Sequence, residues 1–195
     1  MAEKTGAIIT GSFFIEKEVK YYNSLIWMRP DGIYDSYEKR HVFSMGGENE
    51  QIQQGTKKLI VDLNGWKIAP MICYDLRFPV WSKNTITQDG SYAYDLAIYV
   101  ANWPSVRSYP WEMLLIARAI ENLSYVAGVN RVGYDKQGIL HSGDSMIIDP
   151  KGKVIEKADE GKERSLSAVL CYGELKRFRE KFNVGPDWDQ FEILV

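Results

Sequence analysis

Cysteine and histidine are scarce in this sequence. Its 195 residues hold only two cysteines, Cys73 and Cys171, and only two histidines. The two cysteines lie far apart and match no metal-binding spacing. We therefore expect no metal site and no disulfide, and the cytoplasm is the default compartment for such a chain.

Long apolar runs and a strong charge of either sign are also lacking. No stretch approaches the roughly 18–20 apolar residues that a membrane span needs. The first residues lack the basic and apolar regions of a signal peptide. The net charge of −2 gives no electrostatic reason to expect a nucleic-acid partner. The sequence therefore predicts neither a membrane nor a nucleic acid as a partner.

The composition is that of one globular domain. Hydrophobic residues make up 45% of the chain and charged residues 26%, values that are ordinary for such a domain. The chain is long enough to bury a sizeable core. No repeat, low-complexity tract or linker divides it, so we treat residues 1–195 as a single domain.

Apolar runs bounded by turn residues predict the secondary structure. We expect one strand that ends near Tyr37 and others near residues 6–15, 20–29, 57–63, 66–73, 94–101, 124–131, 143–149, 153–157 and 166–172. We expect a short helix from residue 79, a long helix that Pro110 opens, and a last helix over residues 173–181. Strands that alternate with helices and are followed by hairpins predict mixed α/β layers.

The run WKIAPMICYDLRFP, from Trp66 to Pro79, is the most informative segment. Its apolar residues predict a strand covered on both faces. Cys73 stands where that strand ends, and a turn rich in polar residues follows at once. A thiol in this position can be a nucleophile that meets a substrate. Taken alone, the segment fits equally a small buried structural cysteine, since most free cysteines are core residues.

Four segments, in this order, resemble the nitrilase superfamily of carbon–nitrogen hydrolases. They are YEKRHVFSMGGE before residue 49, CYDLRFPVWSKN from residue 73, ARAIEN with YVAGVNRVG, and GDSMIIDPKGKV. The second segment is especially similar to the version found in omega-amidases, which deamidate 2-oxo acid amides. The resemblance runs from about residue 1 to residue 192. It implies an α/β fold with four layers, an α-β-β-α sandwich of two sheets with helices outside.

The resemblance also implies a catalytic set. The family uses a cysteine, a lysine and a glutamate, and Cys73 and Lys39 match its nucleophile and its oxyanion-binding lysine. The backbone amide of Tyr74 is expected to be the second oxyanion donor. Glu48 matches a second glutamate that orients the substrate or the lysine. The family's general base, another glutamate, is expected ahead of residue 1, so we expect an N-terminally incomplete domain that lacks roughly its first quarter.

Further residues near these segments are candidates for substrate binding. Arg77 could hold a substrate carboxylate through a bidentate pair, or could form a local ion pair with Asp75. Phe78, Asn102 and Trp103 follow strand ends and are expected to line the pocket, although Trp103 could equally be a core residue.

Four residues are expected outside the chemistry. We expect a structural role for His41, a surface position for His141 and a buried strand position for Cys171. Arg118 is expected to pair with Glu121 on one face of a helix.

These observations favour an amidase that acts on small omega-amides of 2-oxo dicarboxylic acids, such as 2-oxoglutaramate. The reaction would pass through a cysteine thioester and release ammonia, without a metal or an organic cofactor. Two alternatives remain open. The chain could be another amidase or carbamoylase of the same fold, or a catalytically incomplete module that only binds or assembles. The family resemblance also predicts a homodimer.

Overall fold

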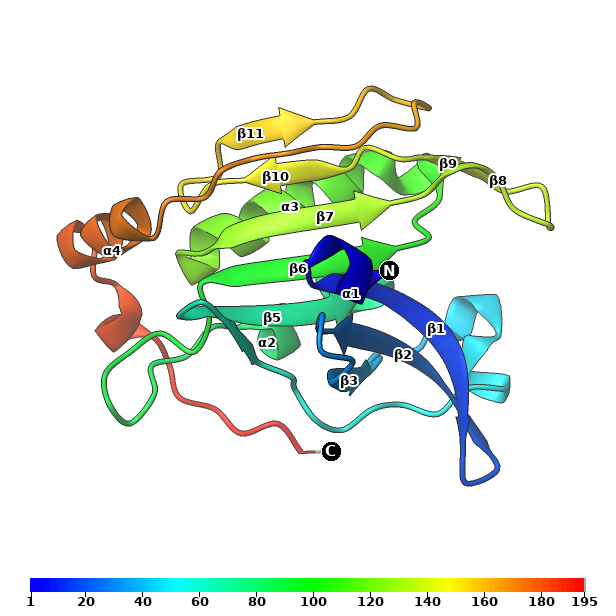
Figure 1. The fold of residues 1–195 in the computed structure, drawn as a ribbon, viewed down its shortest axis with the longest axis horizontal. Helices are drawn as coiled ribbons and strands as arrows, with labels where there is room; N and C mark the ends of the chain where they lie inside the picture. Colours follow the sequence, from blue (N-terminus) through cyan, green and yellow to red (C-terminus); the bar gives the residue numbers. More distant parts are fainter. Residues whose placement is uncertain (195) are drawn as a thin grey trace.

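The largest of three sheets forms the centre of the molecule. The computed structural model describes residues 1–194. Six strands follow one another in the order β11-β10-β7-β6-β5-β4 (Figure 1). They are β4 (Val61–Leu63), β5 (Trp66–Ile72), β6 (Leu96–Ala101), β7 (Tyr125–Asn130), β10 (Met146–Ile148) and β11 (Val154–Lys157). Because β5, β6 and β7 are parallel, their carboxyl ends meet at one edge of the sheet.

A three-stranded antiparallel sheet lies against one end of the larger sheet. Its strands are β1 (Ile9–Lys17), β2 (Lys20–Met28) and β3 (Tyr34–Glu38). Trp27 of β2 is buried together with Val61 of β4 and Ile68 of β5. This contact joins the two sheets. It also brings the end of β3 close to the end of β5.

Helix α3 (Ser108–Asn122) covers the opposite face of the larger sheet (Figure 1). Trp111 and Leu115 are fully buried against this face. The helix approaches β7 so closely that a Cβ atom at Gly128 would overlap both side chains. Only glycine therefore permits this contact between helix and sheet.

The remaining elements are short. The other α-helices are α1 (Ala2–Thr5), α2 (Pro79–Ser82) and α4 (Tyr172–Lys181). The 3₁₀ helices are η1 (Ser44–Gly46), η2 (Glu48–Glu50), η3 (Cys73–Arg77), η4 (Ser105–Arg107) and η5 (Gly185–Asp187). Strands β8 (Val132–Tyr134) and β9 (Leu140–Ser142) form a separate hairpin. Within residues 1–194, no helix is long and apolar enough to cross a membrane.

The α/β class predicted from the sequence is confirmed. The six-stranded sheet packs on helix α3 through one buried cluster and on strand β2 of the three-stranded sheet through another, and the predicted four-layer sandwich stays a prediction. The hairpin over Asn64 and Gly65 joins β4 to β5 as predicted.

Three details of the predicted secondary structure are wrong or incomplete. Residues 166–171 form no strand, although their side chains alternate between half-buried and exposed as a strand's would. The apolar side chains of this segment are therefore packed as in a strand, although its backbone forms no hydrogen bonds with a neighbouring strand. The long helix begins at Ser108, and Pro110 lies inside its first turn, where a missing N–H costs nothing. The β8–β9 hairpin was not predicted at all.

Candidate active site

Cys73 lies at the end of β5 in a backbone conformation that is rare for its residue type. Its φ angle is +46°, in the left-handed region, and the 3₁₀ helix η3 begins at this residue. Such a conformation costs on the order of 1–3 kcal/mol in a residue other than glycine, and it is often retained for function. The half-buried thiol faces the carbonyl of Asn102, with 3.9 Å between Sγ and oxygen. Asn102 follows β6, so the ends of two parallel strands meet here.

Asp75 holds this sharp turn in place. Its carboxylate is fully buried and accepts four hydrogen bonds. Oδ2 accepts the Tyr37 hydroxyl at 2.7 Å and the Ile72 amide at 3.1 Å. Oδ1 accepts the amide and the ring Nδ1 of His41, both at 2.9 Å. A carboxylate is only an acceptor, so Nδ1 of His41 carries the proton. Asp75 therefore ties the turn at Cys73 to the segment that follows β3.

Lys39 stands in that segment, directly after β3, and is 3% exposed. Its ammonium lies 2.6 Å from Oε2 of Glu48, and the same oxygen accepts the Phe43 amide at 2.5 Å. The Lys39 backbone is fixed on both sides, because its N–H donates to Asn23 and its carbonyl accepts from Gly55. The buried ion pair thus has a fixed position and few alternative geometries.

The electrostatics of the site keep the thiol neutral. Burial raises the pKa of the Cys73 thiol above its ordinary value, and the Lys39 ammonium partly opposes this shift. Glu48 and Asp75 act in the same direction as burial. That Lys39 acts on the thiol means that the two groups lie within electrostatic reach of each other. The thiolate is the attacking form of a cysteine, so a nucleophilic role requires a group that takes up the proton.

The other predicted site residues surround the turn at Cys73. The Tyr74 ring lies edge-on to the rings of Phe43 and Phe78, with centroids 5.0 and 5.1 Å away. Phe78 stacks on His41, with ring centroids 3.7 Å apart. Asn102 is exposed and presents its carbonyl to the thiol.

Trp103 and Arg77 lie one on the other. The guanidinium of Arg77 is 5.0 Å from the centroid of the Trp103 ring. Trp103 is only 3% exposed and packs on Trp111, so its ring belongs to the core rather than to an open pocket wall. Its indole N–H donates to the carbonyl of Arg107 at 2.7 Å.

Three expectations about residues near the motifs are wrong. Asp75 forms no ion pair with Arg77, because its carboxylate accepts hydrogen bonds from Tyr37, His41 and the Ile72 amide, and Arg77 lies on Trp103 instead. His141 is only 3% exposed and therefore buried. Its ring Nδ1 lies 3.0 Å from the carbonyl oxygen of Ile139 in the β8–β9 hairpin. Cys171 is exposed and precedes α4 without forming part of a strand.

His41 and Arg118 show what the sequence could indicate only in part. The structural role predicted for His41 is confirmed by its bond to Asp75. The predicted pair of Arg118 with Glu121 is present at 2.8 Å. Arg118 additionally donates to the carbonyl of Leu76 inside η3 at 2.6 Å, a contact that the helical spacing alone does not suggest.

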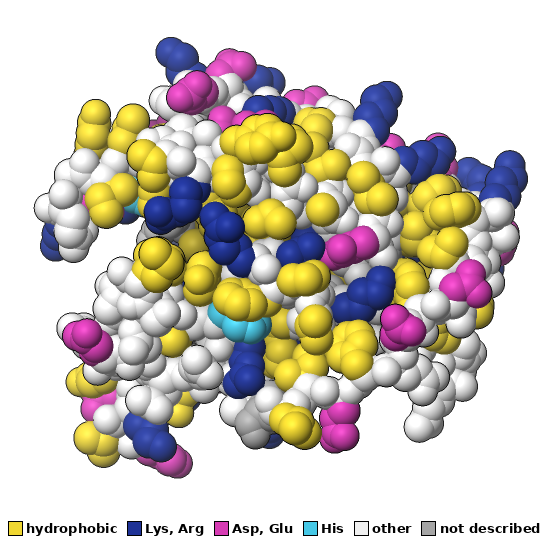
Figure 2. Space-filling view, turned by 180° about the vertical axis from the view of Figure 1, so that it is seen from behind, with side chains coloured by type: hydrophobic (Ala, Val, Ile, Leu, Met, Phe, Trp, Pro, Cys, Tyr) yellow, Lys and Arg dark blue, Asp and Glu magenta, His cyan; other side chains and the backbone are white. Residues whose placement is uncertain are grey.

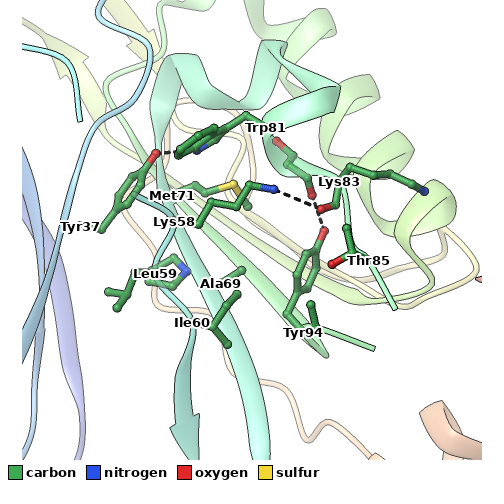
Figure 3. A pocket seen from close by; sticks show the side chains of 13 residues that line it. Tyr37, Lys58, Leu59, Ile60, Ala69, Met71, Trp81, Lys83, Thr85 and Tyr94 are labelled. Atoms are coloured by element: carbon green, nitrogen blue, oxygen red, sulfur yellow. Dashed lines mark hydrogen bonds between the residues drawn. The ribbon is translucent and has the colours of Figure 1, made fainter. Parts of the chain in front are cut away.

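A cavity of about 240 Å³ lies behind the turn, on the α2 side of β5 (Figure 3). Its wall includes Trp81, whose indole N–H donates to the Tyr37 hydroxyl, and Met71. The Lys58 side chain also lines it and extends toward the carbonyl of Lys83 (Figure 3). None of the predicted catalytic residues lines this cavity, so it is not the candidate active site.

A comparison with known protein families identifies the class of this chain. The family model for carbon–nitrogen hydrolases matches residues 1–179. The chain therefore belongs to the carbon–nitrogen hydrolase family, and it is an enzyme of that class.

Three individual proteins are similar to most of this chain. The chain is similar to omega-amidase YafV of Escherichia coli strain K12, with 44% identity over 98% of this chain and 73% of the relative. It is 35% identical to 2-oxoglutaramate amidase of Bacillus subtilis, over 95% of this chain and 70% of that protein. The crystal structure of a CN-hydrolase superfamily protein from Xanthomonas campestris, with an arsenic adduct in its active site, matches with a TM-score of 0.96 and 41% identity. That match covers 98% of this chain and 73% of the other.

Proposed function

We propose that this chain hydrolyses amide C–N bonds through a thioester on Cys73. One observation carries the proposal. A cysteine in a left-handed conformation at a strand end lies within electrostatic reach of a buried lysine that a glutamate holds in place. A solvated lysine beside a structural cysteine would need neither the strained turn nor the ion pair.

The chemistry proceeds in two steps. The thiolate attacks the amide carbonyl carbon, and the resulting tetrahedral oxyanion accepts hydrogen bonds from the Lys39 ammonium and the Tyr74 amide. Tyr74 is the second residue of η3, and N–H groups at the start of a helix have no acceptor within it. The C–N bond then breaks, and the nitrogen takes up a proton and leaves as ammonia. Water cleaves the thioester, which releases the acid and restores the thiol.

A proton acceptor must first convert the neutral thiol into the thiolate. Within residues 1–194, Glu48 is engaged by Lys39 and Phe43, and Asp75 already accepts four hydrogen bonds. We therefore assign Glu48 to the positioning of Lys39 and not to proton transfer. Following the family resemblance, we propose that the family's general-base glutamate takes up this proton.

For the substrate we propose an omega-amide of a 2-oxo dicarboxylic acid. The similarity to an omega-amidase and to a 2-oxoglutaramate amidase supports this choice. Arg77 supports it as well, because a guanidinium beside the nucleophile suits a substrate that carries a carboxylate. Phe78 and Asn102 are proposed to shape the same pocket, and Trp103 is proposed to support it from the core by carrying Arg77 on its ring. A cytoplasmic homodimer is the proposed state of the protein, which size-exclusion chromatography with light scattering would test.

Ammonia release from 2-oxoglutaramate tests the proposal. Cys73→Ala should abolish the release, whereas Cys171→Ala, which removes the exposed thiol, should leave it unchanged. Mass spectrometry of the quenched reaction should show an acyl adduct on the peptide that holds Cys73. Ammonia release that survives in Cys73→Ala would refute the thioester mechanism. Release from a simple carbamoyl compound but not from any omega-amide would favour the alternative amidase or carbamoylase.

A further inference from the structure

Arg107 carries a positive charge for which the described residues offer no counterion. Within residues 1–194, Arg77 and Arg107 are the half-buried arginines whose guanidinium groups have neither a carboxylate nor a carbonyl partner. The other arginines that are not exposed all have one: Arg29 pairs with Asp35, Arg40 donates to Gly55, Arg118 pairs with Glu121, and Arg179 pairs with Asp95. A partly buried charge without a partner is unfavourable, so its retention points to a ligand of opposite charge.

The position of Arg107 is fixed by the same residues that build the site. It ends η4, a short helix that follows the end of β6. Its N–H donates to the Pro104 carbonyl at 3.0 Å, and its carbonyl accepts the indole N–H of Trp103 at 2.7 Å. Trp103 is the residue after Asn102, whose carbonyl faces the thiol. The backbone of Arg107 is therefore tied to the strand end that meets Cys73.

The side chain of Arg107 reaches the ring of Phe43, which belongs to the same segment as Lys39 and Glu48. Its guanidinium carbon is 5.5 Å from the centroid of the Phe43 ring. The Phe43 ring contacts Tyr74, next to the nucleophile, and the Phe43 amide donates to Glu48. A guanidinium that lies on an aromatic face keeps its N–H edge free for a planar anion. The stacking thus orients the group in advance and leaves its donors available.

The surroundings leave no competing anion for Arg107. Glu48 is neutralised by Lys39, and Asp75 is fully buried under four donors. Figure 2 shows Lys and Arg side chains among hydrophobic ones on the face of the molecule turned away from the viewer in Figure 1. Since Glu48 and Asp75 are already engaged, the charge of Arg107 is available to a negatively charged ligand.

We propose that Arg107 binds, together with Arg77, the carboxylate of an anionic amide substrate and thereby helps to determine the specificity of the site. This inference rests on the proposed function, because it names the residue that binds the unreactive, carboxylate end of the proposed substrate. In 2-oxoglutaramate, three carbon atoms separate the carboxylate from the amide carbonyl. The amide lies at Cys73, and the carboxylate reaches the rim where Arg107 lies on Phe43. Arg107 is then a substrate-binding residue that the sequence motifs did not indicate.

Equilibrium binding of 2-oxoglutarate, measured by calorimetry, tests this role without requiring turnover. The dianion keeps the carboxylate of the substrate and has no amide to hydrolyse. Arg107→Ala should weaken its binding about 10- to 100-fold, because a hydrogen-bonded charge pair is lost. Arg107→Lys keeps the charge but not the fork of donors, so its affinity should be intermediate. Arg164→Ala, the control, removes an exposed arginine outside the site and should bind like the unchanged chain.

The steady-state kinetics separate this inference from the proposed function. Arg107→Ala should lower kcat/KM for 2-oxoglutaramate by a similar factor, mainly through KM, and leave kcat/KM for the uncharged pentanamide unchanged. If no amide is hydrolysed but 2-oxoglutarate binds in an Arg107-dependent manner, the proposed function fails and the inference stands. If Arg107→Ala binds 2-oxoglutarate as tightly as the unchanged chain, or if the unchanged chain does not bind it, the inference is overturned.

Discussion

Replacing Asp75 with asparagine should destabilise the fold and also misplace Lys39. The carboxylate accepts four hydrogen bonds through two oxygens, and no part of it is exposed. Asparagine has the same shape but offers only one acceptor oxygen and places an NH₂ group at the other position. If the NH₂ replaces Oδ2, it faces the Ile72 amide, and if it replaces Oδ1, it faces the His41 amide. In either orientation two donors point at each other.

The size of the effect follows from these contacts. A buried donor left without an acceptor costs about 1–3 kcal/mol. The hydrogen bonds that remain lose their charge assistance, which roughly halves their strength. We therefore expect Asp75→Asn to lower the free energy of unfolding by about 2–4 kcal/mol. The Tyr37 hydroxyl cannot easily compensate by reversing its role, because it already accepts from Trp81 and from Arg40.

Urea unfolding followed by tryptophan fluorescence measures the stability, and ammonia release measures the activity. Under conditions in which the variant is folded, kcat should still fall about 10- to 100-fold, because small displacements of positioned groups are costly in rate. Asp62→Asn is the matched control, since this exposed carboxylate accepts the Gly65 amide and asparagine can do the same. Its free energy of unfolding should change by less than about 0.5 kcal/mol.

A result in which Asp75→Asn unfolds at the urea concentration of the unchanged chain would refute this reasoning. It would mean that the four donors find other acceptors when the carboxylate is lost. Unchanged stability together with a lower kcat would also contradict it, because the stabilising and positioning roles arise here from the same hydrogen bonds.

Two further substitutions test the electrostatics of the chain. Lys39→Met removes the ammonium that lowers the pKa of Cys73, so this pKa should rise further and iodoacetamide should alkylate the thiol more slowly at pH 8, while exposed Cys171 reacts at an unchanged rate as the internal reference. Arg179→Met should lower the free energy of unfolding by about 3–5 kcal/mol in thermal or urea unfolding, because it leaves the Asp95 carboxylate, 2.5 Å from the guanidinium and 3% exposed, without its counterion.

Each substitution has a matched control in the chain. Lys57→Met removes an exposed lysine and should leave the alkylation of Cys73 unchanged. Faster alkylation in Lys39→Met would mean that the ammonium hinders access to the thiol more than it favours the thiolate. Arg177→Met changes an exposed arginine of the same helix α4 and should alter stability only slightly. Equal effects of Arg177→Met and Arg179→Met would exclude the buried ion pair as the cause.

Local patterns in the sequence were sufficient for most of the fold. The apolar run from Trp66 to Ile72 specifies a strand buried on both faces, and a turn signal at Asn64 and Gly65 fixes where it begins. The same reasoning fails at residues 166–171, because alternation reports which side chains are half-buried and not whether the backbone finds a partner strand. The class of fold depends on many such segments and tolerates this error.

The contacts of the site depend on residues that are far apart in the sequence. The closest basic residue after Asp75 is Arg77, and sequence proximity therefore suggested an ion pair between them. The structure instead supplies Asp75 with donors from Tyr37 and His41, which only the packing of the two sheets brings near. No periodic pattern encodes such a contact, and the same holds for the position of Arg107 against Phe43.

The two halves of the candidate site come from different sheets. Lys39 follows the three-stranded sheet, whereas Cys73 follows the six-stranded sheet. Asp75 joins them directly, because its carboxylate binds the turn at Cys73 and the segment around Lys39 at once. Stability and catalysis should therefore fall together when Asp75 is changed. Lys39 provides the contrast: its ammonium pairs with Glu48 and acts on the thiol, so its loss should affect the chemistry more than the packing of the two sheets.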